Sequence, residues 1–402
     1  MKKNKSLQNN KVILDIRHFL IAAYCLITYF EPYMNGILGS IVKYYMFAVI
    51  LCLLLLTRSI VIRNYHYPLL LWLGYKFLSV LWTKDTTVFQ LHYASQLGII
   101  ALLLCITTVK HSEESLVWIR RSLWLGSAII GVLSLFMSAP YDNVANRQVL
   151  TLFGQQNDPN NQAAFLLFGL AISMYYLLYQ KKHRLVHLAV IFINAYATLM
   201  TGSRAGLLSI GMILLVYLLT LYNPKTLKTY YQRIAVVVLL IAAASIVLIT
   251  FLPADITERL LNFTDYVGGS NRERLWSHGL QMLNDPITLL FGAGWGSYKA
   301  DGGFTSLHNT FLSILCDTGI LGFCLLFVPI GWILIKLLKA KHPLPISLFI
   351  AGIAPAFFIE AINKRFFWSA ILYVYIAYNA YLKEKTPDDT PAETKRRCRY
   401  IK

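Results

Sequence analysis

Long apolar runs cover most of the chain and predict about twelve helices that span a membrane. Most runs approach the roughly 20 apolar residues that a spanning helix needs. Runs such as VVVLLIAAASIVLITFL lack the polar–apolar alternation of half-buried strands, so the predicted fold class is an all-α integral membrane protein. The third and fourth runs are the weakest candidates. The expected spans are residues 18–34, 41–57, 68–83, 96–109, 120–139, 162–180, 187–202, 205–222, 232–253, 312–338, 345–362 and 366–382.

Two polar segments interrupt this pattern. The shorter, residues 140–161, is rich in Asn and Gln, and the longer, residues 255–319, separates the ninth and tenth spans. Within the longer segment, a helical spacing of Arg and apolar residues predicts an amphipathic helix at the membrane interface. The residues with this spacing are Arg272, Trp276, Leu280 and Leu283.

The remainder of the long segment predicts a break and a second helix. The glycines of GAGWGS (292–297) are expected to end the amphipathic helix. Thr305 or Ser306 is expected to cap a helix that carries His308 and continues into the tenth span.

Composition and charge fix the class and the orientation. The chain is 57% hydrophobic and only 14% charged, which is too apolar for a soluble protein of 402 residues. The net charge of +18 is concentrated in the tails and in alternate connections such as KKHR and KAKH. This positive-inside pattern places both termini in the cytoplasm and residues 255–319 outside. It explains the basic charge without nucleic acid, which is not an expected partner.

The chain is expected to form one membrane domain, residues 17–382, between a cytoplasmic N-tail (1–16) and a basic cytoplasmic C-tail (383–402). The first span lacks a small-residue cleavage site, so no cleaved signal peptide is expected. The six cysteines show no paired spacing, and neither a P-loop nor a dinucleotide motif occurs. We therefore expect no disulfide, no metal and no cofactor.

Cationic residues in the outer segments are the first candidates for a binding site, because charge at membrane depth is costly and usually functional. Arginine suits a diphosphate because its planar group donates two parallel hydrogen bonds. Each of these residues could instead be an interfacial anchor. Of Lys364 and Arg365, one is expected to pair with Glu360, and the other is expected to bind the anion together with Arg204 and Arg272. The candidates are Arg204, Arg272, Arg274, Lys364 and Arg365.

His308 is the candidate base, because a neutral imidazole can take a proton from a hydroxyl group. The alternatives are a structural histidine at a helix start or an imidazolium that binds phosphate. Asp317 follows nine positions later, out of phase on a helix, and cannot form a dyad with His308. Asp158, Asp265 and Asp317 are the alternative bases.

Asparagines in the same outer segments are further candidates for substrate binding. Asn309 follows His308 and is also expected to support local hydrogen bonding. Asn157 and Asn161 lie in the Asn-rich segment.

Five motifs together resemble the bacterial O-antigen ligase and polysaccharide polymerase family, which are membrane glycosyltransferases of the GT-C type. They span about residues 140–370, and the earlier helices match only in hydropathy. The order and outer placement of the motifs make the combination more specific than any single one. The motifs are GQQNDPNNQAA (154–164), TGSRAGLL (201–208), NRERLW with FGAGWGSY (271–298), LHNTF with CDTGILG (307–322) and FIEAIN with Trp368 (358–368).

The resemblance implies transfer of a glycan from undecaprenyl diphosphate to a glycan or lipid-linked acceptor on the outer face of the cytoplasmic membrane. By this resemblance Arg204 and Arg272 would hold the diphosphate and His308 would serve the acceptor hydroxyl. Direct attack would invert the anomeric centre. Ligase and polymerase both remain open. The alternative from another class is a flippase or other transporter, but transporters distribute polar residues along many spans, whereas here they gather in outer segments.

Overall fold

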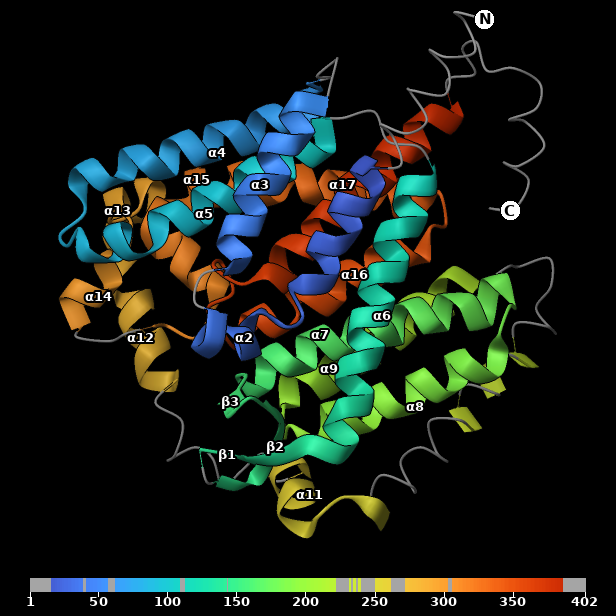
Figure 1. The fold of residues 1–402 in the computed structure, drawn as a ribbon. Helices are drawn as coiled ribbons and strands as arrows, with labels where there is room; N and C mark the ends of the chain where they lie inside the picture. Colours follow the sequence, from blue (N-terminus) through green and yellow to red (C-terminus); the bar gives the residue numbers. More distant parts are fainter. Residues whose placement is uncertain are drawn as a thin grey trace, which may run out of the picture.

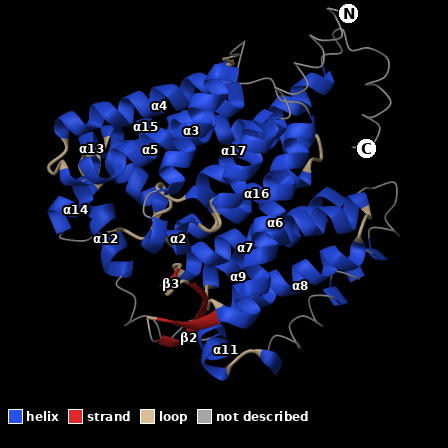
Figure 2. Cartoon of the chain, viewed as in Figure 1, coloured by secondary structure: helices blue, strands red, loops and turns tan. Residues whose placement is uncertain are grey.

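The structure, a computed structural model, describes residues 16–385 except 39–40, 57–61, 109–112, 143, 222–230, 233, 236–237, 240–249, 262–271 and 303–305. Both tails, most of the ninth expected span and Asp265 therefore lie outside the described residues. The described part is predominantly helical (Figure 2). Its α-helices, after a first one at Ile16–Ile27, are α2 (Glu31–Leu38), α3 (Ile41–Leu56), α4 (Tyr67–Leu78), α5 (Thr87–Thr108), α6 (Glu113–Met137), α7 (Pro159–Tyr175), α8 (Arg184–Met200), α9 (Arg204–Leu221), α11 (Ala254–Leu261), α12 (Arg272–Met282), α13 (Pro286–Phe291), α14 (Ser297–Gly302), α15 (Thr310–Lys339), α16 (Pro343–Ile353) and α17 (Arg365–Lys385).

Four described helices are long and apolar enough to cross a membrane, which confirms the helical membrane fold in outline. Shorter apolar helices account for other expected spans, whereas the total of twelve stays a prediction. The four are Leu116–Met137, Pro159–Gln180, Arg204–Leu221 and Thr310–Lys339.

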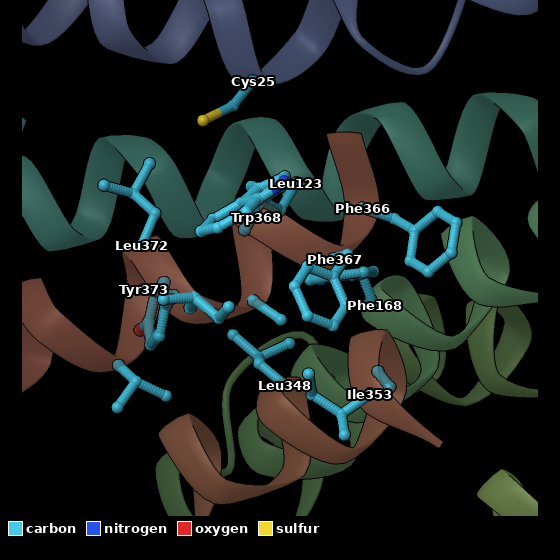
Figure 3. Close-up of a cluster of buried hydrophobic side chains, with 14 of the residues drawn as sticks. Cys25, Leu123, Phe168, Leu348, Ile353, Phe366, Phe367, Trp368, Leu372 and Tyr373 are labelled. Carbon is cyan, nitrogen blue, oxygen red and sulfur yellow. The ribbon is translucent and has the colours of Figure 1, made fainter. Parts of the chain in front are cut away.

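Helix α7 forms the centre of the bundle. Every residue from Pro159 to Met174 is buried, as expected of a helix that is apolar on all sides. It packs against α6, α8, α9 and α16. Phe168 of α7 meets Leu348 and Ile353 of α16 and Phe367 of α17 (Figure 3). This core holds α7 and α17 rigidly, and both helices begin next to the polar segments described below.

Three features depart from the apolar pattern. The first expected span is interrupted at residues 28–30, between the first helix and α2. The span expected at 345–362 ends early, because α16 stops at Ile353 and a 3-10 turn, Pro355–Phe357, follows. Residues 138–156 form a small antiparallel sheet of β1 (Ser138–Tyr141), β2 (Val144–Leu152) and β3 (Gln155–Gln156), in the order β1-β2-β3. The sequence did not predict this sheet.

The polar segments gather along one edge of the molecule. Figure 1 shows α2, α12, α11 and the strands at the lower left, far from the end of α17 at the upper right. Helix α11 contacts β2, and α2 contacts β3. Helix α12 packs against α14 and α15.

Candidate functional site

The turn that presents Arg204 is built from the small residues of TGSRAG. Helix α8 ends at Met200, and Gly202 takes a left-handed backbone conformation with φ 60°. The Ser203 hydroxyl accepts a hydrogen bond from the Gly206 amide at 3.1 Å, which caps the start of α9. This short, capped turn places Arg204 at the first position of α9.

Arg204 is held by a second arginine that the sequence did not single out. Its Nε and Nη2 donate to the carbonyl of Arg259 at 3.0 and 2.8 Å, and Arg259 Nε donates to the carbonyl of Gly202 at 3.1 Å. Arg259 lies in the last turn of α11, whose buried Ile256 and Leu260 pack near α8. A basic residue beside the apolar stripe of ADITERLL was the signal that could have identified it.

Arg272 lies close enough to both of these arginines for their charges to act on it. It is half-buried at the first position of α12, with its guanidinium 5.7 Å from the centre of the Phe358 ring. Burial lowers its pKa, and the charges of Arg259 and Arg204 lower it further, while Asp158 opposes them. Three guanidinium groups in one electrostatic neighbourhood favour an anionic ligand that carries more than one charge.

His308 lies beside the same group. Burial by the surrounding protein and the charge of Arg272 lower the pKa of His308, whereas Asp158 and Glu360 raise it. The side chain retains substantial exposure, and the residue has a left-handed backbone with φ 49°. The structure therefore places an exposed imidazole within range of the charge of Arg272, in surroundings that favour its neutral form.

The helix after His308 starts later than expected. Asn309 is the N-cap of α15, and its side-chain oxygen accepts from the amides of Phe311 and Leu312, both at 3.1 Å. Ser306 instead accepts from the His308 amide at 3.0 Å. The prediction of Thr305 or Ser306 as the cap was wrong, since Asn309 is a better-placed side-chain acceptor. Asn309 thus has the local hydrogen-bonding role that we also considered.

The Asn-rich segment contributes a carboxylate and two buried amides. Asp158 is the N-cap of α7, accepting from the amides of Asn160 and Asn161, and its charge reaches both Arg272 and His308. Asn157 and Asn161 are only 4% and 6% exposed, and Asn161 Nδ2 lies 3.4 Å from Asn157 Oδ1. Their side chains therefore have little surface open to a ligand.

Helix starts add to the positive character of this region. Helices α7, α9, α12 and α15 begin at Pro159, Arg204, Arg272 and Thr310, each at or within two residues of a group described above. The partial positive charge at a helix N-terminus favours nearby anions. The cluster of Asp158, Arg204, Arg259, Arg272 and His308 is called the arginine–histidine cluster below.

Three expected binding residues lie elsewhere or point away. Arg365 is 5% exposed and donates from Nε to Glu31 at 3.0 Å, so its charge is already neutralised inside the protein. Lys364 is exposed. One of Lys364 and Arg365 was expected to pair with Glu360. Arg365 pairs with Glu31 of α2 instead, and Lys364 forms no ion pair with Glu360 among the described residues. Arg274 is exposed and, two positions from Arg272 on α12, projects about 200° around the helix axis from it.

The amphipathic helix itself is present with a shifted face. In α12 the buried residues are Leu275 and Gly279, whereas Leu280 is 58% exposed. The helix ends at Met282, before the glycines that were expected to end it. Asp285 and Pro286 then start α13.

The glycine-rich segment FGAGWGSY fastens α4 to α15. A Cβ on Gly292 would lie 2.4 Å from the Asp317 carbonyl oxygen, so only glycine permits this backbone contact. The Gly296 amide donates to Asp317 Oδ1 at 2.8 Å, and Lys76 of α4 lies 3.6 Å from Asp317 Oδ2. Asp317 thereby takes part in a buried ion pair. Its expected phase relative to His308 does not apply, because His308 lies outside α15.

Comparison with known families shows a similarity that includes the residues of this cluster. Residues 189–327 match the family model of the O-antigen ligase. The predicted resemblance to that family is confirmed. No match to a curated protein was found. The matched segment, about a third of the chain, contains Arg204, Arg259, Arg272 and His308.

Proposed function

We propose that this protein transfers a glycan from an undecaprenyl-diphosphate-linked donor to an acceptor glycan at the outer face of the bacterial cytoplasmic membrane. The observation that carries the proposal is the arginine–histidine cluster, which combines three cations with an imidazole. Arg204, Arg259 and Arg272 bind the diphosphate, and His308 faces the acceptor. The O-antigen ligase match over the same residues supports this choice of reaction.

The reaction needs two complementary groups. His308 takes the proton of the acceptor hydroxyl as that oxygen forms a bond to C1 of the donor sugar. The bond between C1 and the diphosphate oxygen breaks, and its electron pair leaves with undecaprenyl diphosphate. The arginines neutralise the developing charge, so the proposal uses no metal ion. A single direct displacement inverts the configuration at C1.

The acceptor divides the proposal into two forms. A ligase would join a finished polysaccharide to a glycolipid, whereas a polymerase would extend a chain that is itself linked to the carrier. Both forms require the same donor chemistry at the arginines. They differ in whether the product remains attached to undecaprenyl diphosphate.

Purified protein in detergent, mixed with a lipid extract from cells that lack the gene, tests the proposal. We expect release of undecaprenyl diphosphate and a larger glycan product. His308→Ala should lower the transfer rate roughly 10²–10⁴-fold while binding of the carrier-linked donor is retained. Movement of an unchanged carrier-linked glycan across a proteoliposome bilayer, without transfer, would instead identify a flippase.

A further inference from the structure

Glu360 is a half-buried carboxylate beside the arginine–histidine cluster that the reaction above does not use. It lies in the turn between Pro355–Phe357 and α17, and its Oε1 accepts from Tyr298 Oη at 2.6 Å. The nearby ammonium of Lys76 is already engaged by Asp317. Within the described part of the chain, the second oxygen of Glu360 has no hydrogen-bond partner. The side chain is partly exposed, so this oxygen is accessible to a ligand.

The backbone around Glu360 is fixed to the segment that carries His308. The hydroxyl of Thr310, which is fully buried, donates to the Ile359 carbonyl at 2.7 Å and accepts from the Ala361 amide at 2.7 Å. Thr310 follows His308 by two positions. The two bonds enclose Glu360 on both sides, so its carboxylate and the imidazole keep a constant relation.

The side chain of Glu360 is fixed by its hydrogen bond from Tyr298. Tyr298 is 1% exposed, and its main-chain carbonyl lies 3.3 Å from His278 Nε2 of α12. A carboxylate held at one oxygen presents the other in one direction. Such an oxygen accepts hydrogen bonds from neutral hydroxyl groups and repels phosphate.

We propose that Glu360 binds hydroxyl groups of the acceptor sugar and sets the orientation in which it meets His308. This inference rests on the proposed function and specifies its acceptor as a polyhydroxylated sugar. The donor diphosphate is bound on the arginine side and the acceptor sugar on the Glu360 side, with His308 between them.

Glu360→Gln is the direct test, because it keeps the size of the side chain and an acceptor for Tyr298. Its amide would then present a donor to the sugar in place of a charged acceptor. At saturating donor, we expect the KM for the glycolipid acceptor fraction from gene-deleted cells to rise about 10- to 100-fold. The KM for the carrier-linked donor should stay within about twofold. Glu273→Gln, an exposed carboxylate next to Arg272, is the matched control and should change neither.

Other results would overturn the inference. An unchanged acceptor KM in Glu360→Gln, or a change confined to the donor KM, would show that the carboxylate does not bind acceptor. If Glu360→Gln does not fold, Tyr298→Phe keeps the carboxylate but frees one oxygen, and it must still raise the acceptor KM selectively. If the wild-type protein transfers no glycan, the proposed function fails, and acceptor binding by wild type and Glu360→Gln then decides the inference separately.

Discussion

The three arginines of the cluster are positioned by different means, which predicts different sensitivities to substitution. The Arg204 side chain donates to the backbone carbonyl of Arg259, and the Arg259 side chain donates to the carbonyl of Gly202 in the turn before Arg204. Arg272 contacts the Phe358 ring and, among the described residues, takes part in no ion pair. Its charge is therefore the one most directly available to a ligand, and its loss should affect donor binding most.

Arg272→Gln is expected to raise the KM for the carrier-linked donor about 10- to 100-fold, because a hydrogen-bonded charge pair with phosphate is lost. Arg274→Gln is the matched control, since it removes the same charge two residues away on the other side of α12. Steady-state kinetics with varied donor measures both. Equal effects of the two substitutions would indicate a general electrostatic attraction to the membrane surface in place of a defined diphosphate site.

The pH dependence of transfer follows from the environment of His308. A base must be neutral, and partial burial together with Arg272 lowers the pKa of His308, with Asp158 and Glu360 opposing. Activity should therefore be full at pH 7 and fall on acidification only below the usual histidine pKa of about 6.5. Rates measured from pH 4.5 to 8 test this. An imidazolium that binds phosphate would give the opposite slope, with activity rising as the pH falls.

At the residue scale, the sequence singles out isolated charged groups but does not reveal which partner from another segment such a group has. Arg204, Arg272 and His308 stood out because they are polar groups at the ends of apolar runs. Arg365 looked equivalent, but its partner Glu31 comes from a helix that is distant in the sequence. Arg259 was missed because its importance comes from two backbone carbonyls that only the folded turn brings near.

At the scale of elements, the segment FGAGWGSY contacts both α4 and α15 and holds them together. Gly292 has φ 80° and Gly319 has φ 60°, and a Cβ on either would lie 2.4 Å from the backbone of the other segment. Gly319 also interrupts α15 with a non-helical conformation. The glycines thus fix where the segment carrying His308 and Asn309 enters the bundle.

Gly292→Ala should lower the free energy of unfolding by about 1–3 kcal/mol or more. The alanine backbone would have to keep a positive φ, and its Cβ would clash with the Asp317 carbonyl. Gly331→Ala is the control, since a Cβ there meets nothing within 4 Å and α15 is regular at that point. The midpoint of thermal unfolding in detergent measures both. A midpoint for Gly292→Ala as high as that of Gly331→Ala would exclude the close backbone contact.

Helices such as α8, α9, α15 and α17 were predictable to within a few residues because lipid requires continuous apolar runs with satisfied backbones. Helices α5 and α6 begin well before their expected spans. The small sheet at residues 138–156 was not predictable, because its strands contain Pro140 and several polar residues and lack alternation. The early end of α16 reflects Pro355 and the turn after it. Hydropathy indicates whether a segment lies in lipid or in water. The small sheet and the early end of α16 depend instead on backbone geometry and tertiary contacts.

At the scale of the whole molecule, α15 links the candidate site to a basic loop. It begins at Thr310, two residues after His308, and is 30 residues long, with Lys336 and Lys339 in its last turn. The part after Gly319 is still long enough to cross a hydrocarbon core of about 30 Å. We therefore expect the two ends of α15 to face opposite sides of the membrane, with the lysine end in the cytoplasm by the positive-inside rule.

This orientation can be measured with single cysteines in a chain whose six native cysteines have been replaced. Glu273→Cys, on the exposed face of α12, should react with a membrane-impermeant maleimide added to intact spheroplasts. Lys339→Cys, exposed at the other end of α15, should react only after the membrane is permeabilised. The reverse pattern would place the arginine–histidine cluster in the cytoplasm and contradict an outer-face reaction. Labelling of both positions from outside would show instead that α15 does not span the membrane, because its two ends could then share one aqueous phase.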